Sequence, residues 1–301
     1  MRKDDADSGR RALGATAADF RDLGDIAPLT EFPTRHGGRL GYRRYGQGDV
    51  ALVFIHGSSA DCDYLAPLGR AVAAIGLSVV TPTLRGHGAN PTWRGDVDYN
   101  GQLLDDIDDL LVHLRDDWKT RRILIGGHSS GGGLALKYAL ERPSSAAAGL
   151  LLVAPFIHHR APSARPGAGG WARPRIGRLA LISMLNAFGI TRFDDRPVVS
   201  FNVPPELRRP STTDAYSFRM LASMSPGNDW RQRLARMATP TVLIAGRDDG
   251  AFLAEGYDAA MSPAPRARVE ILEGVSHMDI VLRPTGLDRI ARAAQALAIA
   301  G

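Results

Sequence analysis

The sequence of 301 residues contains almost no cysteine. Its single cysteine, Cys62, excludes an internal disulfide, which fits a reducing compartment. A lone thiol also raises the question of a cysteine nucleophile. Its neighbours are Asp61 and Asp63, whose negative charges would raise the pKa of the thiol and make it less reactive. We therefore expect Cys62 to be a small, partly buried residue without a catalytic role.

Lysine is scarce as well, since only three of the 37 basic residues are lysines. The net charge is nevertheless +5, because arginine is abundant. These arginines are scattered along the chain and form no basic stripe with interleaved aromatic residues. We therefore do not expect the protein to bind nucleic acid.

Long hydrophobic runs are also missing. No apolar run is long enough to span a membrane, and the N-terminus has no apolar segment of signal-peptide length. Residues 1–25 are mostly polar, and we expect them to form a flexible N-terminal tail. The expected location is cytoplasmic.

Short apolar runs alternate with helical patterns along the rest of the chain. The runs occupy residues 50–55, 77–80, 123–125, 150–153, 241–245 and 269–272. Continuous hydrophobicity of this length is typical of strands covered on both faces. Between two of these runs, Leu103, Ile107 and Leu110 follow helical spacing. The alternation predicts an α/β fold with a mostly parallel, eight-stranded sheet flanked by helices, built from residues 26–154 and 237–301.

The alternation breaks over residues 155–236, which we interpret as a helical cap, or lid, above the carboxyl edge of the sheet. Residues 156–236 hold 13 arginines, no lysine, four aspartates and one glutamate, which gives a net charge of +8. Such a charge would attract anionic acyl substrates, or favour transient contact with a membrane or lipid surface. The alternative is that the arginines only solvate the cap.

The strongest local motif is Gly127-His128-Ser129-Ser130-Gly131. It follows an apolar run and precedes a helical stretch, which is the setting of the G-x-S-x-G nucleophile elbow. Glycines are needed there because the turn is sharp and side chains would collide with the adjacent strand and helix. We predict that Ser129 is a nucleophile at a helix N-terminus, where the helix dipole favours developing negative charge.

A second motif, His56-Gly57-Ser58-Ser59, directly follows residues 50–55. Enzymes with this elbow form an oxyanion hole from two backbone N–H groups, one after the nucleophile and one in an earlier loop. Those donors would be Ser130 and Ser58. We interpret His56 as a structural residue that holds the loop by hydrogen bonding.

Two later loops supply a candidate acid and a candidate base. Asp248 and Asp249 follow a late apolar run, and a carboxylate there can hold a histidine in the required tautomer. We favour Asp249, with Asp248 as the alternative. His277 follows the last apolar run and would take the proton of Ser129. The order serine, aspartate, histidine is that of a hydrolase triad.

These motifs together resemble the α/β-hydrolase superfamily from about residue 32 to the end, and the lysophospholipase and monoacylglycerol-lipase-like branch most of all. The matching pieces are His56-Gly57-Ser58, Leu84-Arg85-Gly86-His87-Gly88, Gly127-His128-Ser129-Ser130-Gly131, Gly246-Arg247-Asp248-Asp249 and Ser276-His277-Met278. The resemblance implies a serine hydrolase of carboxylic esters that needs no cofactor and acts on a small-molecule acyl ester.

Two alternatives stay open from the sequence. The same triad can cleave thioester, amide or carbon–carbon bonds, because substrate choice depends on the cap. A hydrolase fold can also serve as a non-catalytic ligand-binding protein. We do not expect a metal site at His158-His159, because adjacent histidines point in different directions and no cysteine or carboxylate lies nearby in the sequence.

Overall fold

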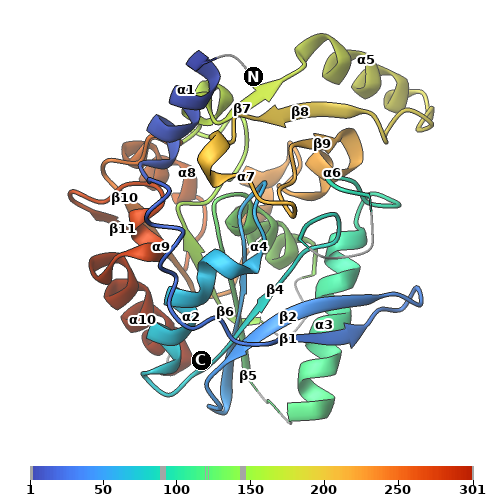
Figure 1. Ribbon diagram of the computed structural model, residues 1–301. Helices are drawn as coiled ribbons and strands as arrows, with labels where there is room; N and C mark the ends of the chain where they lie inside the picture. Colours follow the sequence, from blue (N-terminus) through green and yellow to red (C-terminus); the bar gives the residue numbers. More distant parts are fainter. Residues whose placement is uncertain (1–2, 89–92, 119, 121, 143–146, 300–301) are drawn as a thin grey trace.

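A central sheet of eight strands organises the molecule (Figure 1). The computed structural model describes residues 3–88, 93–118, 120, 122–142 and 147–299. The strands are β1 (Leu29–Pro33), β2 (Arg39–Tyr45), β3 (Val50–Ile55), β4 (Ser78–Pro82), β5 (Arg122–His128), β6 (Ala147–Val153), β10 (Thr241–Gly246) and β11 (Ala267–Leu272). Their spatial order is β1-β2-β4-β3-β5-β6-β10-β11. Only the β1–β2 and β2–β4 pairs are antiparallel, so the predicted mostly parallel sheet is confirmed.

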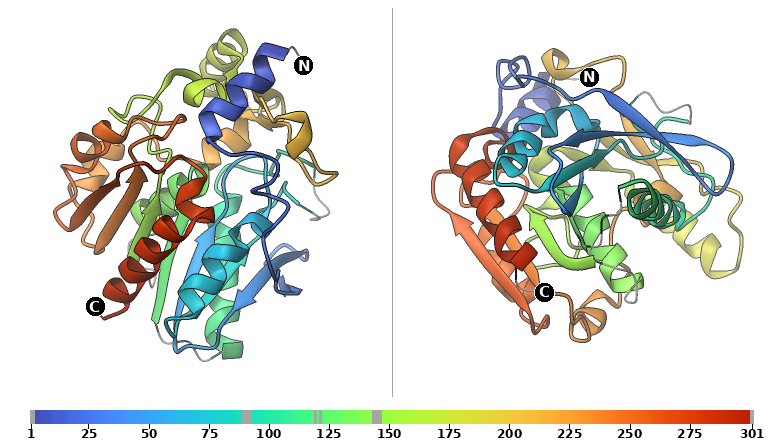
Figure 2. Two further views of the ribbon diagram at one scale, coloured as in Figure 1. Left: turned by 60° about the vertical axis from the view of Figure 1, so that its left-hand side comes forward. Right: turned by 90° about the horizontal axis from the view of Figure 1, so that it is seen from below.

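Helices cover both faces of the sheet, as the continuous apolar runs predict (Figure 2). On one face, α2 (Ala66–Ala73) packs beside α10 (Pro284–Ile299). On the other face lie α3 (Gln102–Trp118) and α4 (Ser130–Glu141). Strand β3 serves both layers, because successive side chains of a strand point to opposite faces. Val53 and Ile55 join the core under α3 and α4, whereas Leu52 and Phe54 join the core under α2 and α10.

The segment inserted between β6 and β10 forms the cap. Its helices are α5 (Ile176–Ala187), α6 (Phe218–Ser223) and α7 (Trp230–Leu234), with short 3-10 helices at Pro166–Gly170 and Pro205–Leu207. The cap also contains a three-stranded antiparallel sheet of β7 (Ala172–Pro174), β8 (Pro197–Phe201) and β9 (Ala215–Ser217), which sequence reasoning missed. The buried, β-branched pair Val198 and Val199 in β8 was the available signal.

The N-terminus differs from the flexible tail expected over residues 1–25. Residues 1 and 2 lie outside the described residues, but α1 (Lys3–Leu13) packs against the 3-10 helix Pro166–Gly170 of the cap. Ala12 is fully buried and Leu13 is nearly so. The apolar residues of this segment are few, but helical spacing gathers them on one face, and that face has a partner in the folded chain.

The remaining short helices are α8 (Tyr257–Met261), α9 (Asp279–Leu282) and the 3-10 helices Cys62–Leu65 and Ala254–Gly256. Among the residues that the structure describes, no helix is both long and apolar enough to cross a membrane.

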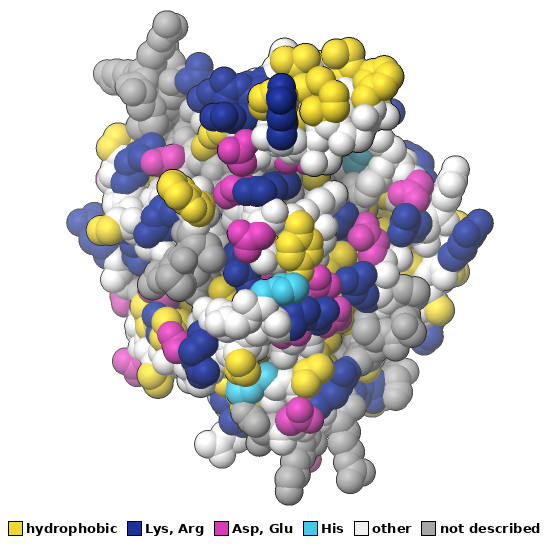
Figure 3. Space-filling model, turned by 90° about the vertical axis from the view of Figure 1, so that its right-hand side faces the viewer, with side chains coloured by type: hydrophobic (Ala, Val, Ile, Leu, Met, Phe, Trp, Pro, Cys, Tyr) yellow, Lys and Arg dark blue, Asp and Glu magenta, His cyan; other side chains and the backbone are white. Residues whose placement is uncertain are grey.

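Helix α5 exposes an unusual number of apolar side chains. Figure 3 shows apolar side chains gathered at the top of the molecule, where α5 lies, with basic side chains beside them. The exposed residues of this region are Ile176, Leu181, Met184, Phe188 and Ile190. Contact between the basic cap and a membrane or lipid surface stays a prediction.

Candidate active site

Ser129 occupies a sharp turn between β5 and α4. Its φ is 59° and its ψ is −123°, a strained conformation for a residue with a side chain that costs about 1–3 kcal/mol. Three hydrogen bonds impose it: Ser129 N–H donates to Val153 O (3.0 Å), and Ser129 O accepts from Gly133 N–H (3.1 Å) and Phe156 N–H (2.9 Å). The strain is therefore built into the junction of β5, β6 and α4, and it lifts the hydroxyl away from the sheet.

The two glycines of the elbow are sterically required. A Cβ on Gly131 would lie 2.3 Å from His56 O, and a Cβ on Gly127 would lie 2.4 Å from the backbone of Gly131. Carbon atoms do not approach oxygen or carbon this closely, so larger residues would push the turn apart. The packing that the sequence pattern predicts for the elbow is present.

His277 and Asp249 form a buried pair. His277 Nδ1 lies 2.8 Å from Asp249 Oδ2, and the two residues are 3% and 2% exposed. The other carboxylate oxygen of Asp249 accepts from Ala251 N–H (2.7 Å) and Phe252 N–H (2.9 Å). Asp248, by contrast, is exposed. Of the two aspartates that the sequence offered, the structure brings Asp249 to the histidine.

This hydrogen bonding defines the state of the imidazole. A carboxylate that already accepts two backbone N–H groups receives the Nδ1–H of His277. A neutral His277 then has its lone pair on Nε2, the nitrogen on the opposite side of the ring from Asp249.

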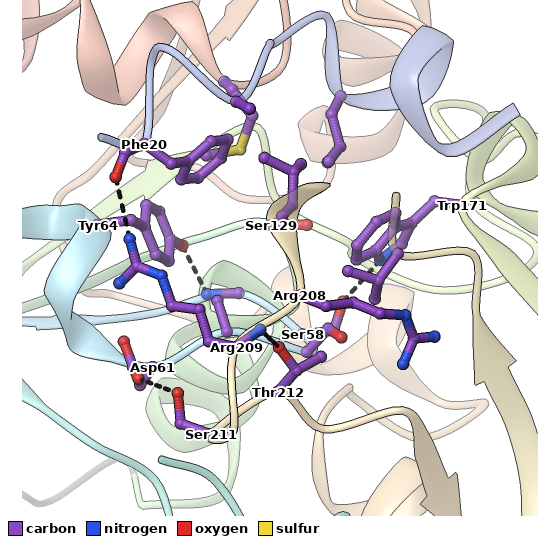
Figure 4. A pocket seen from close by; sticks show the side chains of 18 of the residues that line it. Phe20, Ser58, Asp61, Tyr64, Ser129, Trp171, Arg208, Arg209, Ser211 and Thr212 are labelled. Carbon is purple, nitrogen blue, oxygen red and sulfur yellow. Dashed lines mark hydrogen bonds between the residues drawn. The ribbon is translucent and has the colours of Figure 1, made fainter. Parts of the chain in front are cut away.

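Ser129 and His277 line one cavity of about 240 Å³. Figure 4 shows Ser58, Tyr64, Ser129 and Trp171 around the same space. The cavity wall comes from five places: the segment around the end of α1, the loop after β3, the elbow, the cap, and the loop of His277. The sheet brings together three of them, the loop after β3, the elbow and the loop of His277, which lie more than 50 residues apart in the sequence.

The loop proposed to carry an oxyanion donor is held by the cap. Ser59 has a φ of 72°, and it exchanges two hydrogen bonds with Thr213: Thr213 N–H donates to Ser59 O (3.0 Å), and Ser59 Oγ donates to Thr213 O (2.6 Å). Ser58 Oγ accepts from Trp171 Nε1 (3.0 Å). Ser58 lines the cavity, and Ser130 is buried at the start of α4, next to Ser129.

His56 bridges two loops. Its Nδ1 donates to Gly57 O (2.8 Å) and its Nε2 accepts from Leu84 N–H (3.1 Å). Burial lowers the pKa of His56, which favours this neutral form. These contacts agree with the structural role predicted for the residue.

A chain of hydrogen bonds that sequence reasoning missed connects the loops of the site. His128 Nε2 lies 3.0 Å from His277 O, and a carbonyl can only accept, so Nε2 carries the proton. Nδ1 of His128 then accepts from the hydroxyl of Tyr64 (3.0 Å). The Tyr64 oxygen in turn accepts from Gly57 N–H (2.7 Å). Burial lowers the pKa of His128 well below its ordinary value, with His277 as a second cause.

The sequence contained only part of the signal for these hydrogen bonds. His128 lies inside the elbow motif and was available as a candidate, but Tyr64 stands in no recognisable pattern. Its hydroxyl reaches His128 only because the turn after β3 and the end of β5 are neighbours in the sheet.

Cys62 is buried, and its pKa is raised to about 12. The first cause is burial, and the charges of Asp61 and Asp63 add to it. Burial is therefore a stronger reason than the acidic neighbours for the low reactivity expected of the Cys62 thiol.

Comparison with known proteins matches most of the chain. A family described as "Serine aminopeptidase, S33" matches residues 46–280. An uncharacterized protein of Mycobacterium tuberculosis is 28% identical over 280 residues, covering 86% of this chain and 79% of its own length.

Solved structures share the fold. Monoglyceride lipase from Saccharomyces cerevisiae superposes with a TM-score of 0.64 at 16% identity, covering 91% of this chain and 96% of the lipase. Monoacylglycerol lipase from Paleococcus ferrophilus gives a TM-score of 0.62 at 17% identity, with coverages of 86% and 98%. The similarity predicted from the motifs is confirmed at the level of the fold.

Proposed function

Because the chain belongs to the serine aminopeptidase family of α/β-hydrolases, we propose that it is a serine hydrolase that cleaves carboxylic esters through an acyl-enzyme on Ser129. One observation carries the proposal: His277, hydrogen-bonded to Asp249, lines the same cavity as Ser129. This arrangement supports the proposed roles of Ser129 as nucleophile, His277 as base and Asp249 as the group that orients the base.

In the proposed reaction, Nε2 of His277 removes the proton of the Ser129 hydroxyl while Oγ attacks the ester carbonyl. The new C–O bond forms as the carbonyl electrons move onto oxygen, which gives a tetrahedral oxyanion. When the oxyanion collapses, the alcohol leaves with the proton from His277. Water then attacks the acyl-enzyme by the same steps, releases the carboxylic acid and restores Ser129. Asp249 stabilises the imidazolium in both halves of the cycle.

The backbone N–H groups of Ser58 and Ser130 are the proposed donors to the oxyanion. Ser130 is the first residue of α4, where N–H groups have no partner within the helix. Ser58 lies in the loop that Thr213 and Trp171 hold in place. A donor fixed in advance costs no reorganisation during the reaction, and one such donor contributes about 3 kcal/mol to lowering the barrier.

The groups on either side of the ester bond are proposed from the environment of the cavity. Apolar side chains from the segment after α1 and from the cap face Ser129 across the cavity: Leu13, Phe20, Trp171, Val203 and Leu207. This apolar part of the wall suits an uncharged acyl or alcohol group. The charged residues that line the rest of the cavity are Arg21, Asp61, Glu206, Arg208 and Arg209. Thioesters, amides and carbon–carbon bonds are the alternatives for the same triad. A panel of p-nitrophenyl esters, acyl thioesters and aminoacyl p-nitroanilides, assayed with one enzyme preparation, separates them by kcat/KM.

The chemistry is tested by labelling with a fluorophosphonate, which phosphonylates an activated serine. We expect mass spectrometry to locate the label on Ser129, and Ser129→Ala to lose both labelling and ester hydrolysis. Ser183→Ala, an exposed serine in α5, is the matched control and should behave as the wild type. Folded wild-type protein that takes no label would contradict the proposal and favour a non-catalytic ligand-binding protein.

A further inference from the structure

The segment of residues 13–21, here named the strap, forms part of the wall of the catalytic cavity. Four of its residues, Leu13, Ala17, Phe20 and Arg21, line the space that also contains Ser129. The strap lies before residue 46, where the family match begins. Its position next to the proposed nucleophile makes it relevant to substrate choice.

One end of the strap is attached to the loop that carries the proposed base. Met278 N–H donates to Leu13 O (3.0 Å), and Ser276 Oγ donates to Gly14 O (3.2 Å). Gly14 has a φ of 64°, and a Cβ there would lie 2.4 Å from the Cβ of Ser276. The strap thus packs directly on the residues that flank His277.

The other end is attached to the cap. An Nη of Arg209 donates to Phe20 O (2.9 Å), a contact that Figure 4 shows. Just before the strap, Arg10 binds Glu206 through two parallel hydrogen bonds of 2.6 and 2.9 Å. Arg283 also pairs with Asp19. Since both ends are held, the side chains between them are placed over the cavity by the folded chain.

The volume of the cavity is small. At about 240 Å³ it lies below the roughly 300–1,000 Å³ of pockets that bury drug-sized ligands. The ring of Phe20 belongs to this boundary, together with Trp171 and Leu207 of the cap. The space suits a compact acyl or alcohol group better than an extended fatty-acyl chain.

From these contacts we infer that the strap is a specificity-determining element, which makes the enzyme favour compact esters because Phe20 narrows the cavity. The inference rests on the proposed ester hydrolysis at Ser129 and names its substrate class. Removing the Phe20 ring opens the wall, whereas a larger ring narrows the space further.

The test compares Phe20→Ala and Phe20→Trp with the wild type on p-nitrophenyl butyrate and p-nitrophenyl decanoate. We expect Phe20→Ala to raise the decanoate-to-butyrate ratio of kcat/KM by about tenfold, since each fitted or excluded methylene changes the rate severalfold. Phe20→Trp should lower the ratio. Asp22→Asn, an exposed neighbour that does not line the cavity, is the control and should leave the ratio unchanged.

Labelling rates with a short-chain and a long-chain alkyl fluorophosphonate give a second readout that does not depend on ester cleavage. The same shift in ratio is expected in Phe20→Ala. If Ser129 reacts but both Phe20 variants keep the wild-type ratios and the wild-type melting temperature, the strap has no selecting role. If wild-type Ser129 reacts with neither probe and no ester is cleaved, the proposed function fails, and the strap's role fails with it.

Discussion

Nε2 of His128 lies 3.0 Å from the carbonyl oxygen of His277, so the side chain beside the proposed nucleophile supports the backbone of the proposed base. Through Tyr64 the same chain of hydrogen bonds reaches Gly57, next to the proposed oxyanion donor Ser58. The direction of every hydrogen bond in this series is fixed, because the series begins at Gly57 N–H, which can only donate, and ends at His277 O, which can only accept. The three loops of the site are therefore positioned relative to one another.

Tyr64→Phe should lower kcat by about tenfold and change KM little. The hydroxyl is the partner of both Gly57 N–H and His128 Nδ1, and leaving buried polar groups without a partner costs about 1–3 kcal/mol. Part of that free energy is lost from the transition state, because the loops that hold the reacting groups are less well positioned. Steady-state kinetics and thermal melting measure the two effects. Tyr99→Phe is the control, because its hydroxyl bonds Asp105 outside the cavity. An unchanged kcat in Tyr64→Phe would mean that the chain only stabilises the fold.

Asp249→Asn should reduce kcat by about 10³-fold to 10⁴-fold, because an amide no longer holds the imidazole in the tautomer that accepts the serine proton. The neighbouring Asp248 offers a matched control, since it is exposed and His277 bonds Asp249 instead. Asp248→Asn is expected to keep wild-type rates. Equal losses in the two variants would show that the pair is not the functional acid–base unit.

Stability should fall as the pH drops below the ordinary pKa of histidine. Burial lowers the pKa of His56 and His128 and brings that of His87 to about 3. Below about pH 6.5 these histidines therefore bind protons in the unfolded chain but stay neutral in the folded chain. Each such histidine lowers the free energy of unfolding by about 1.4 kcal/mol per pH unit below that point. Urea unfolding from pH 7 to 5 measures the slope. His87→Gln should have a shallower slope than the wild type, and an equal slope would contradict the assignment.

Gly131→Ala should destabilise the protein by about 1–3 kcal/mol and lower its activity. A Cβ at this position would meet His56 O at 2.3 Å, so the elbow must shift to accept it. Gly177→Ala is the comparison, because nothing lies within 4 Å of a Cβ in α5. Alanine there should stabilise the protein by about 0.5–1 kcal/mol. The melting temperatures of the two variants and the wild type, measured in one buffer, test the prediction. A wild-type melting temperature in Gly131→Ala would contradict it.

Local patterns in the sequence were sufficient for the elements of the sheet and for the loops that carry Ser129, Asp249 and His277. Apolar runs and helical spacing depend on neighbours along the chain, so they predicted the parallel sheet and its two helical layers. The elbow around Ser129 was predictable for the same reason, since its glycines are required by the geometry of a local turn of five residues. The chain order of Ser129, Asp249 and His277 then predicted which loops would meet.

What only the tertiary structure decided involves residues that are distant in the sequence. The choice between Asp248 and Asp249 depends on which carboxylate the loop turns toward His277. Tyr64 joins the site because β3 and β5 are adjacent in the sheet. Residues 13–21 become a wall of the cavity because Leu13 meets Met278 at the far end of the chain. Contacts across such separations leave no periodic trace in the sequence, since the partner is supplied by the folded molecule and not by the neighbouring residues.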